Sequence, residues 1–212
     1  LALPLYRCGT GQILQSIESS FDWVIGDSAF ASGSLSENTG CIGQSLQFDY
    51  SFTAQANESS WVEATHSFPP VDIGGKDFLL LPLFGDPSAV ASDITLSIGD
   101  TSCVGHYHLP EASGLGAWRT LIVPIQRFSG QGCAPNPTAI ESLTLRVSNT
   151  GSSHSGSMYI DDVTAITSDE LTPDIRTRFC PPVESSPQKA LLAEAILHGS
   201  QTALVQNGHP FS

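Results

Sequence analysis

The sequence predicts an all-β protein folded as an antiparallel β-sandwich, and three observations support this. From about residue 12 to residue 167, short apolar runs alternate with clusters of Gly, Pro, Ser and Asp, a rhythm typical of strands joined by turns. Residues 46–52 alternate large apolar and polar side chains, which is the period of a strand with one buried face. Hydrophobic residues form 40% of the 212-residue chain, so it can bury a core of domain size.

Successive segments fit this fold in order. In the strand predicted at 61–68, the even-numbered residues face one way and Trp61, Glu63 and Thr65 face the other. The continuous apolar run at 78–84 predicts a strand buried on both faces. Further strands are predicted at 94–98, 120–125 and 142–147, followed by a closing stretch at 158–166.

Two prolines fall inside predicted strands. Pro82 and Pro124 lack the backbone N–H that a strand ladder uses. Each should therefore occupy a sheet edge, a bulge or a position without a ladder hydrogen bond.

The sequence changes character after residue 167. We divide the chain into an N-terminal extension (1–11), the sandwich (12–167), a proline-containing linker (168–186) and a helical segment (187–212). Ser186 is placed to cap the helix, Pro187 to open it and Gly199 to end it. This helix would either dock on the sandwich or begin another domain.

Composition narrows the possible partners. The chain has 21 acidic and 8 basic residues, a net charge of −13, which disfavours nucleic acid and anionic membranes as partners. No apolar run is long enough to span a membrane. Few Lys residues among many Ser, Thr and Gly is a composition common in secreted proteins, so we expect an extracellular or periplasmic location.

The five cysteines are widely spaced and form no C-x-x-C pair, which disfavours a zinc site or a redox motif. One or two disulfides formed in an oxidising compartment fit this spacing. We predict pairs between Cys103 and Cys133 and between Cys8 and Cys41, with Cys180 left over.

The closing stretch contains two adjacent carboxylates, Asp161 and Asp162. Such a pair resists burial unless a cation, N–H donors or water compensate it. If the fold brings it beside Glu18 or Asp22 near the start of the chain, the group would suit Ca²⁺, which takes oxygen ligands. The alternative is that both carboxylates are simply exposed at a strand end.

Five segments in order resemble the galactose-binding-like β-jelly-roll modules, nearest to family 11 carbohydrate-binding modules and their complex-I-intermediate-associated-protein-30-like relatives. Residues 43–52 (GQSLQFDYSF) resemble the family's "G-x-x-L-x-x-x-Y-x-F" strand. Residues 72–80 and 84–86 are similar to its "D-x-x-x-x-x-x-L" turn and "x-G-D" strand end. Residues 118–128 are similar to its "W-x-x-x-x-(I/V)-P-(L/F)-x-x-F" segment, and 160–163 to its closing "I-D-D-(I/V)". The resemblance covers roughly residues 12–167.

The resemblance implies a two-sheet jelly roll with a structural Ca²⁺ and no catalytic centre. In the family, an acidic residue of the first strand and the closing Asp hold the ion. These positions correspond to Glu18 and Asp161 here, with Asp162 and Asp22 as secondary candidates. Trp118 stands in a segment whose family counterpart packs the core.

Candidate sugar-binding residues follow from how sugars are bound. An aromatic ring stacks on a pyranose face while carboxylates and other polar groups take the hydroxyls. The solvent-side strand face supplies Asp49, Trp61 and Glu63, which we predict form one platform with hydrogen-bond acceptors beside the aromatic ring. The alternative for Trp61 is that it caps the core from a strand end.

The cluster His106-Tyr107-His108 is a second candidate. Its residues could line a ligand groove, and histidines at i and i+2 share a strand face and could bind a transition metal. The third possibility is an ordinary surface strand.

These features predict a non-catalytic carbohydrate-binding module of a larger secreted polysaccharide-active protein, with a polysaccharide or oligosaccharide ligand and an appended catalytic domain. No nucleophile-elbow or zinc-protease motif occurs. A protein- or glycan-interaction module and a jelly-roll polysaccharide lyase or glycoside hydrolase remain the alternatives.

Overall fold

The computed structural model describes residues 12–15, 22–40, 43–53, 59–85, 93–109, 116, 118–130, 132–150 and 153–171. Its elements are β1 (Gln12–Gln15), β2 (Trp23–Asp27), β3 (Ala31–Thr39), β4 (Gln44–Phe52), β5 (Ser59–Val71), β6 (Phe78–Gly85), β7 (Asp93–Gly99), β8 (Val104–His108), β9 (Arg119–Pro124), the 3-10 turn η2 (Ile125–Arg127), β10 (Ile140–Thr150), β11 (His154–Ile160) and β12 (Val163–Ile166). The predicted Cys8–Cys41 pair, Cys180, Glu18, the linker beyond residue 171 and the segment 187–212 lie outside these residues.

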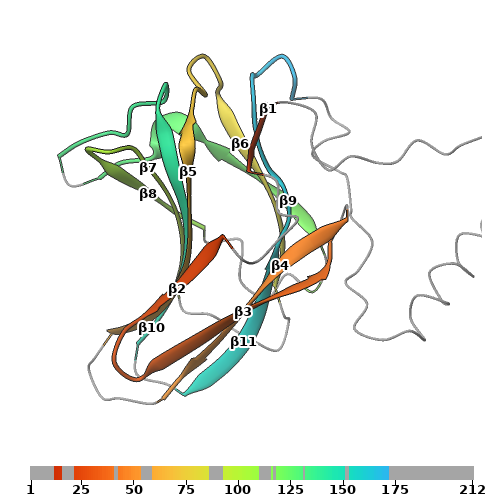
Figure 1. Cartoon of the computed structure of the whole chain (residues 1–212), viewed down its shortest axis with the longest axis vertical. Helices are drawn as coiled ribbons and strands as arrows, with labels where there is room; N and C mark the ends of the chain where they lie inside the picture. Colours follow the sequence, from red (N-terminus) through yellow and green to blue (C-terminus); the bar gives the residue numbers. More distant parts are fainter. Residues whose placement is uncertain are drawn as a thin grey trace, which may run out of the picture.

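Two antiparallel sheets face each other and form a jelly-roll sandwich (Figure 1). One sheet has the order β2-β5-β10-β7-β8, and the other has the order β1-β12-β6-β11-β4-β3 with β9 also paired to β6. The five-stranded sheet is curved, and its outer face is the concave side, on the left of Figure 1. The predicted fold class is therefore confirmed.

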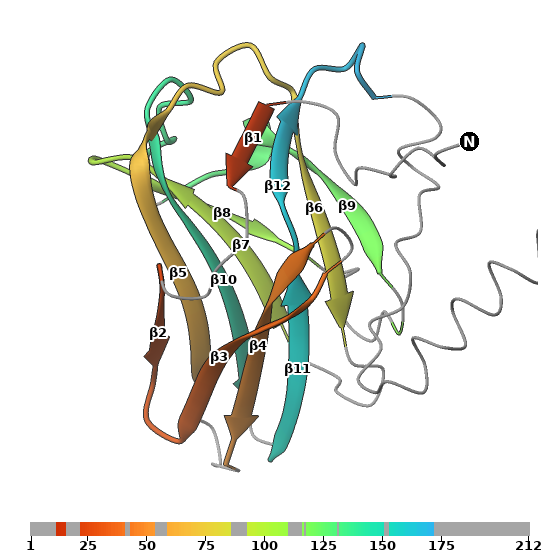
Figure 2. The same cartoon turned by 45° about the vertical axis from the view of Figure 1, so that its right-hand side comes forward.

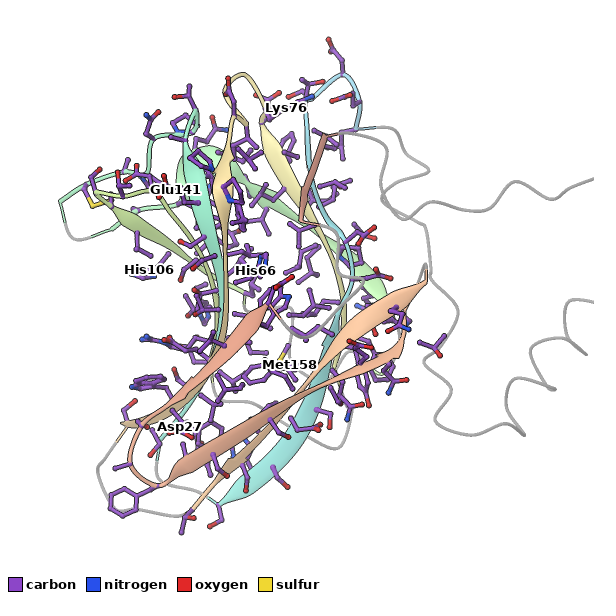
Figure 3. The ribbon with its side chains drawn as sticks, viewed as in Figure 1. Asp27, His66, Lys76, His106, Glu141 and Met158 are labelled. Carbon is purple, nitrogen blue, oxygen red and sulfur yellow. A yellow bond between two sulfur atoms is a disulfide. The ribbon has the colours of Figure 1, made fainter. Side chains whose placement is uncertain are left out.

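The core lies between the sheets and follows the predicted alternation. Leu46, Phe48, Tyr50 and Phe52 of β4 are at most 3% exposed, and they pack against buried residues of the opposite sheet. Figure 3 shows His66 and Met158 between the two sheets, whereas His106 lies on the outer side of β8. Along each strand, successive side chains therefore point alternately into the apolar core and toward an outer face of the sandwich.

Pro82 is accommodated by a break in the sheet. Along one edge of β6, β12 pairs with residues 78–80 and β11 with residues 83–85, so the ladder is interrupted between them. Asp161 fills the gap and donates its N–H to the Pro82 carbonyl at 3.1 Å. Pro82 has no N–H to donate, and it lies where neither β11 nor β12 pairs with β6. No ladder hydrogen bond is therefore lost, as predicted. Pro124 is the last residue of β9, and β9 pairs with β6.

The Cys103–Cys133 disulfide is present. It joins the turn after β7 to the loop before β10, and the Cα atoms lie 6.1 Å apart. The carboxylate of Asp100 reinforces this region by accepting the N–H groups of Ser102, Cys103 and Asn136. Within the described part of the chain, no helix has the length and apolar character needed to cross a membrane.

Candidate functional site

The outer face of the five-stranded sheet collects most of the predicted ligand-binding residues. Strand register places Glu63 of β5 opposite Arg146 of β10. Arg146 stands opposite Thr95 of β7, which in turn stands opposite His108 of β8. We call five side chains on this concave side the candidate binding face: Trp61, Glu63, Arg146, His106 and His108.

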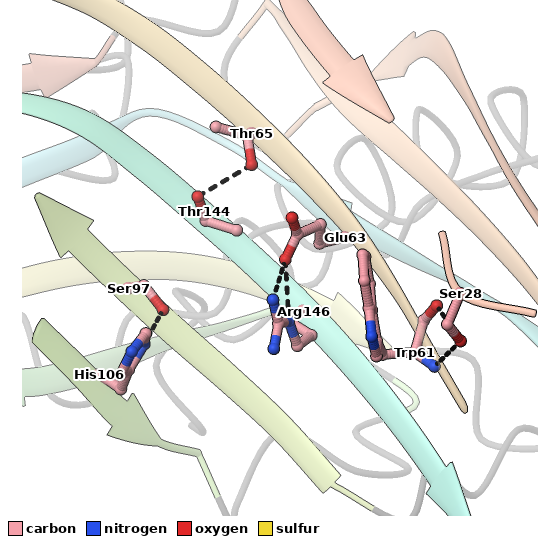
Figure 4. A network of polar contacts seen from close by, with 8 residues as sticks. All are labelled: Ser28, Trp61, Glu63, Thr65, Ser97, His106, Thr144 and Arg146. Atoms are coloured by element: carbon pink, nitrogen blue, oxygen red, sulfur yellow. Dashed lines mark hydrogen bonds and ion pairs between the residues drawn. The ribbon is translucent and has the colours of Figure 1, made fainter. Parts of the chain in front are cut away.

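Arg146 organises the middle of the candidate binding face (Figure 4). Its Nε and Nη2 donate to Glu63 Oε2 at 2.8 and 2.6 Å, and its guanidinium carbon lies 4.6 Å from the Trp61 ring centre. The Glu63 and Arg146 side chains are 22% and 41% exposed, so both retain surface for a ligand. A planar guanidinium beside an aromatic ring and a carboxylate is suited to hydroxyl groups on a stacked ring.

Trp61 lies outside the core cluster and is half-buried on the outer face. Its ring extends over Gly26 of β2, where an added Cβ would lie 3.5 Å from Cζ3. The Trp61 N–H donates to Ser28 Oγ at 2.8 Å, and the Ser28 N–H donates to the Trp61 carbonyl at 2.9 Å. The alternative that Trp61 caps the core is therefore wrong.

The two histidines share one face of β8 as predicted, but Tyr107 does not. His106 Nδ1 and Ser97 Oγ share a hydrogen bond of 2.8 Å, and His108 Nδ1 contacts Asp93 Oδ1. Tyr107 points inward and packs on Phe128 with ring centres 5.8 Å apart, so it does not line a groove on the face that carries the histidines. Among the residues the structure describes, no group of three or more His, Cys, Asp or Glu could hold a metal ion.

Asp49 lies on the other sheet, so the prediction that it shares a face with Trp61 and Glu63 is wrong. It faces outward from β4 and accepts hydrogen bonds from Gln47 Nε2, at 2.9 and 3.1 Å to its two oxygens, and from Ser157 Oγ. Together with several serines, it lines an open groove of about 650 Å³: Ser32, Ser34, Ser51, Ser155 and Ser157.

Asp161 is fully buried, which contradicts the alternative that both closing carboxylates are exposed. Its Oδ1 accepts the N–H of Asp162 at 2.8 Å. Its Oδ2 faces Gly40, where an added Cβ would stand 2.7 Å away. Asp162 is half-buried and Asp22 is exposed. Asp161 therefore offers a buried carboxylate oxygen, the kind of ligand that hard cations prefer, beside a space that only glycine leaves open.

Sequence reasoning missed Arg146. The residue lies in a predicted strand, and its neighbours Leu145 and Val147 are buried, so alternation alone could place it on the outer face. Its partnership with Glu63 depends on β5 pairing with β10. A single sequence does not reveal that pairing, because the two strands are far apart in the chain.

No protein-family model and no curated protein matches this chain. Solved structures do resemble it. The family 11 carbohydrate-binding module of the cellulosomal cellulase Lic26A-Cel5E of Clostridium thermocellum has a TM-score of 0.57 and 16% identity, covering 75% of this chain and 95% of that one. A family 11 module from the same organism in complex with a β-1,3-1,4-mixed-linked tetrasaccharide has a TM-score of 0.55 and 17% identity, covering 74% and 95%.

An enzyme contains a similar region. The β-1,2-glucanase from Parabacteroides distasonis has a TM-score of 0.53 and 16% identity, covering 74% of this chain but 24% of that one. The fold of this chain is therefore that of the β-sandwich carbohydrate-binding modules, as the resemblance of its motifs implied.

Proposed function

We propose that this protein is a non-catalytic carbohydrate-binding module that binds a neutral polysaccharide on the candidate binding face. The observation that carries the proposal is the half-buried Trp61 ring on the concave side of the sheet, with the Arg146 guanidinium over it and the Glu63 carboxylate beside that guanidinium. The ring offers a stacking surface for a pyranose, and the polar neighbours offer donors and acceptors for its hydroxyls. The similar family 11 module bound to a tetrasaccharide supports this class of ligand.

Affinity electrophoresis tests the proposal. The purified protein is run through gels containing β-1,3-1,4-mixed-linked glucan or β-1,2-glucan, and we expect one of these polymers to retard it. Trp61→Ala should weaken binding about tenfold or more, because truncating a central aromatic contact has effects of this size. Asp49→Asn, on the opposite sheet, is the matched control and should bind as the wild type does.

The same samples distinguish binding from catalysis. A binding module leaves the polysaccharide intact, so neither new reducing ends nor unsaturated ends should accumulate. Release of either product would instead favour a hydrolase or a lyase. Absence of retardation by both polymers would contradict the carbohydrate-binding proposal.

The proposal includes a larger host protein. A secreted polysaccharide-active protein with an appended catalytic domain would use this module to hold its substrate. The acidic, lysine-poor composition supports secretion, and the glucanase supports the idea that this fold occurs within larger enzymes. Sequencing the gene on both sides of this segment tests it, and a flanking glycoside hydrolase domain is the expected result.

We also propose a structural Ca²⁺ held by Asp161 and Glu18. The buried Asp161 carboxylate and the space beside it at Gly40 support one oxygen ligand, and hard cations prefer such ligands. The ion would add positive charge beside a carboxylate that burial otherwise disfavours.

A further inference from the structure

We propose that Phe30, in the turn between β2 and β3, is a second aromatic contact for the polysaccharide chain, placed beyond the end of the sheet next to Trp61. This inference rests on the proposed function and adds a specific property to it. The module would recognise a polymer that continues past the candidate binding face, rather than a short oligosaccharide.

The first observation is the backbone of Phe30. With φ at 68°, it is the one non-glycine residue among those described that has a positive φ. This region is strained for a residue with a Cβ, and a bulky aromatic residue is a particularly unusual occupant. Such strain persists where the surrounding structure enforces it, and it is often associated with function.

The second observation is that burial does not explain the aromatic side chain. Phe30 is 44% exposed and lies outside the hydrophobic core clusters. The residue therefore combines an unfavourable backbone conformation with an exposed apolar ring. A glycine at this position would relieve the strain and remove the exposed ring, so neither stability nor solubility favours phenylalanine.

The turn is fixed rather than loosely tethered. The Phe30 carbonyl accepts the Thr53 N–H at 2.9 Å, and the Ala29 carbonyl accepts Ser60 Oγ at 3.2 Å. Within the turn, the Ala31 N–H donates to the Ser28 carbonyl at 3.2 Å. Thr53 follows β4 of one sheet and Ser60 lies in β5 of the other, so contacts to both sheets hold the backbone of the turn in place before any ligand binds.

The same turn is joined directly to Trp61. Three hydrogen bonds link Ser28 to the Trp61 backbone: Ser28 N–H to the carbonyl at 2.9 Å, Ser28 Oγ to the carbonyl at 3.2 Å, and Trp61 N–H to Ser28 Oγ at 2.8 Å. Figure 4 shows Ser28 beside Trp61. Phe30 follows Ser28 by two residues, a separation of at most about 7 Å along the backbone. The Phe30 turn therefore lies at the Trp61 end of the sheet, where an aromatic ring can contact sugar units beyond those held on the candidate binding face.

Val24 lies on the other side of Trp61 from the turn. It faces outward from β2 opposite Thr65 and is 67% exposed, and Gly26 stands between it and the turn. Exposed apolar side chains are therefore found on both sides of Trp61 along this edge of the sheet. This arrangement on both sides of Trp61 favours an extended sugar chain held at Trp61 as the occupant, over an unrelated partner.

The test compares a polymer with a short oligosaccharide. Wild type, Phe30→Gly, Phe30→Ala and Phe30→Tyr are titrated with β-1,3-1,4-mixed-linked glucan and with the corresponding tetrasaccharide, and each melting curve is recorded. We expect Phe30→Gly and Phe30→Ala to bind the polymer about three- to tenfold more weakly, with the tetrasaccharide affinity unchanged. Phe30→Tyr keeps the ring and should bind like the wild type.

The melting curves separate the ring from the backbone. Phe30→Gly should melt about 2–8 °C higher than the wild type because the strain is relieved, while Phe30→Ala should gain no such stability. Equal polymer affinity in the wild type and in a folded Phe30→Gly variant would overturn the proposal. Self-association of the wild type that Phe30→Gly abolishes, without a change in polymer binding, would also overturn it. Failure of the wild type to bind any polysaccharide would instead reject the proposed function itself.

Discussion

The guanidinium carbon of Arg146 lies 4.6 Å from the centre of the Trp61 ring, so one cation contacts the aromatic platform of the sheet while it hydrogen-bonds Glu63. This relationship links the orientation of the ring to that of a carboxylate. The candidate binding face is therefore assembled before a ligand arrives, which lowers the entropy lost on binding.

Arg146→Lys should weaken polysaccharide binding about three- to tenfold, because an ammonium group lacks the planar guanidinium that lies over the ring while two of its N–H groups donate to Glu63 Oε2. Stability should change by less than about 1 kcal/mol, since the pair is partly exposed and screened by solvent. Calorimetric titration and thermal melting measure the two effects. A large loss of stability with unchanged affinity would make the pair structural.

Removal of Ca²⁺ should lower the melting temperature. An ion that binds only the folded state stabilises it by about 2.7 kcal/mol at a hundred times its Kd, which corresponds to a shift of roughly 5–10 °C. Melting in excess Ca²⁺ and in EDTA measures the shift, and Mg²⁺ should restore little of it because Mg²⁺ demands tighter octahedral geometry.

Two variants check that the effect arises at Asp161. Asp161→Ala should melt lower and become indifferent to EDTA, and Asp161→Asn keeps the size of the side chain without its charge. Sugar binding should persist below the new melting point. A wild-type melting curve that does not move between Ca²⁺ and EDTA would reject the ion site.

Reduction of the Cys103–Cys133 disulfide should destabilise the protein. The bond closes a loop with a sequence separation of 30 residues, for which chain-entropy estimates give roughly 3–4 kcal/mol. Urea unfolding of the Cys103→Ser/Cys133→Ser double variant measures this. Polysaccharide affinity should stay unchanged, because neither cysteine belongs to the candidate binding face.

Stability should fall as the pH drops below about 6.5. Burial lowers the pKa of His66, partly opposed by the charge of Asp22, and burial likewise lowers the pKa of His154. In this range the unfolded chain takes up protons that the native state excludes, so the free energy of unfolding decreases until the folded-state pKa is reached.

His66→Phe should flatten this dependence. His66 stacks between Trp23 and Phe68, with ring centres 5.3 and 5.6 Å away, so a phenyl ring can fill its place. Urea unfolding at several pH values measures the slope. An unchanged slope in the double variant His66→Phe/His154→Phe would assign the acid sensitivity to carboxylates instead.

Alternation in the sequence predicted the strands well, because each strand has one dry face and one wet face. It could not predict which sheet a strand joins. Asp49 and Trp61 both face outward from strands that follow each other in sequence, yet β4 and β5 belong to opposite sheets. A shared outward orientation therefore did not mean a shared surface.

Strand alternation also explains why Tyr107 faces away from the histidines. Histidines two residues apart share a face, so the residue between them must face the other way, and here that side is the core. Phe30 carried no signal in the sequence. Its conformation depends on contacts from Thr53 and Ser60, which no local pattern records.

The late strands β11 and β12 pair with strands made earlier, β1 and β6, and this order has a consequence for synthesis (Figure 2). A chain that emerges from the ribosome N-terminus first can pair β6 with β9, but the other edge of β6 waits for residues 154–166. Unpaired edges recruit strands from neighbouring chains, and pairings between distant segments form slowly. Nascent chains released before His154 should therefore aggregate, and lower growth temperatures should raise the yield of native protein by slowing the association of incomplete sheets.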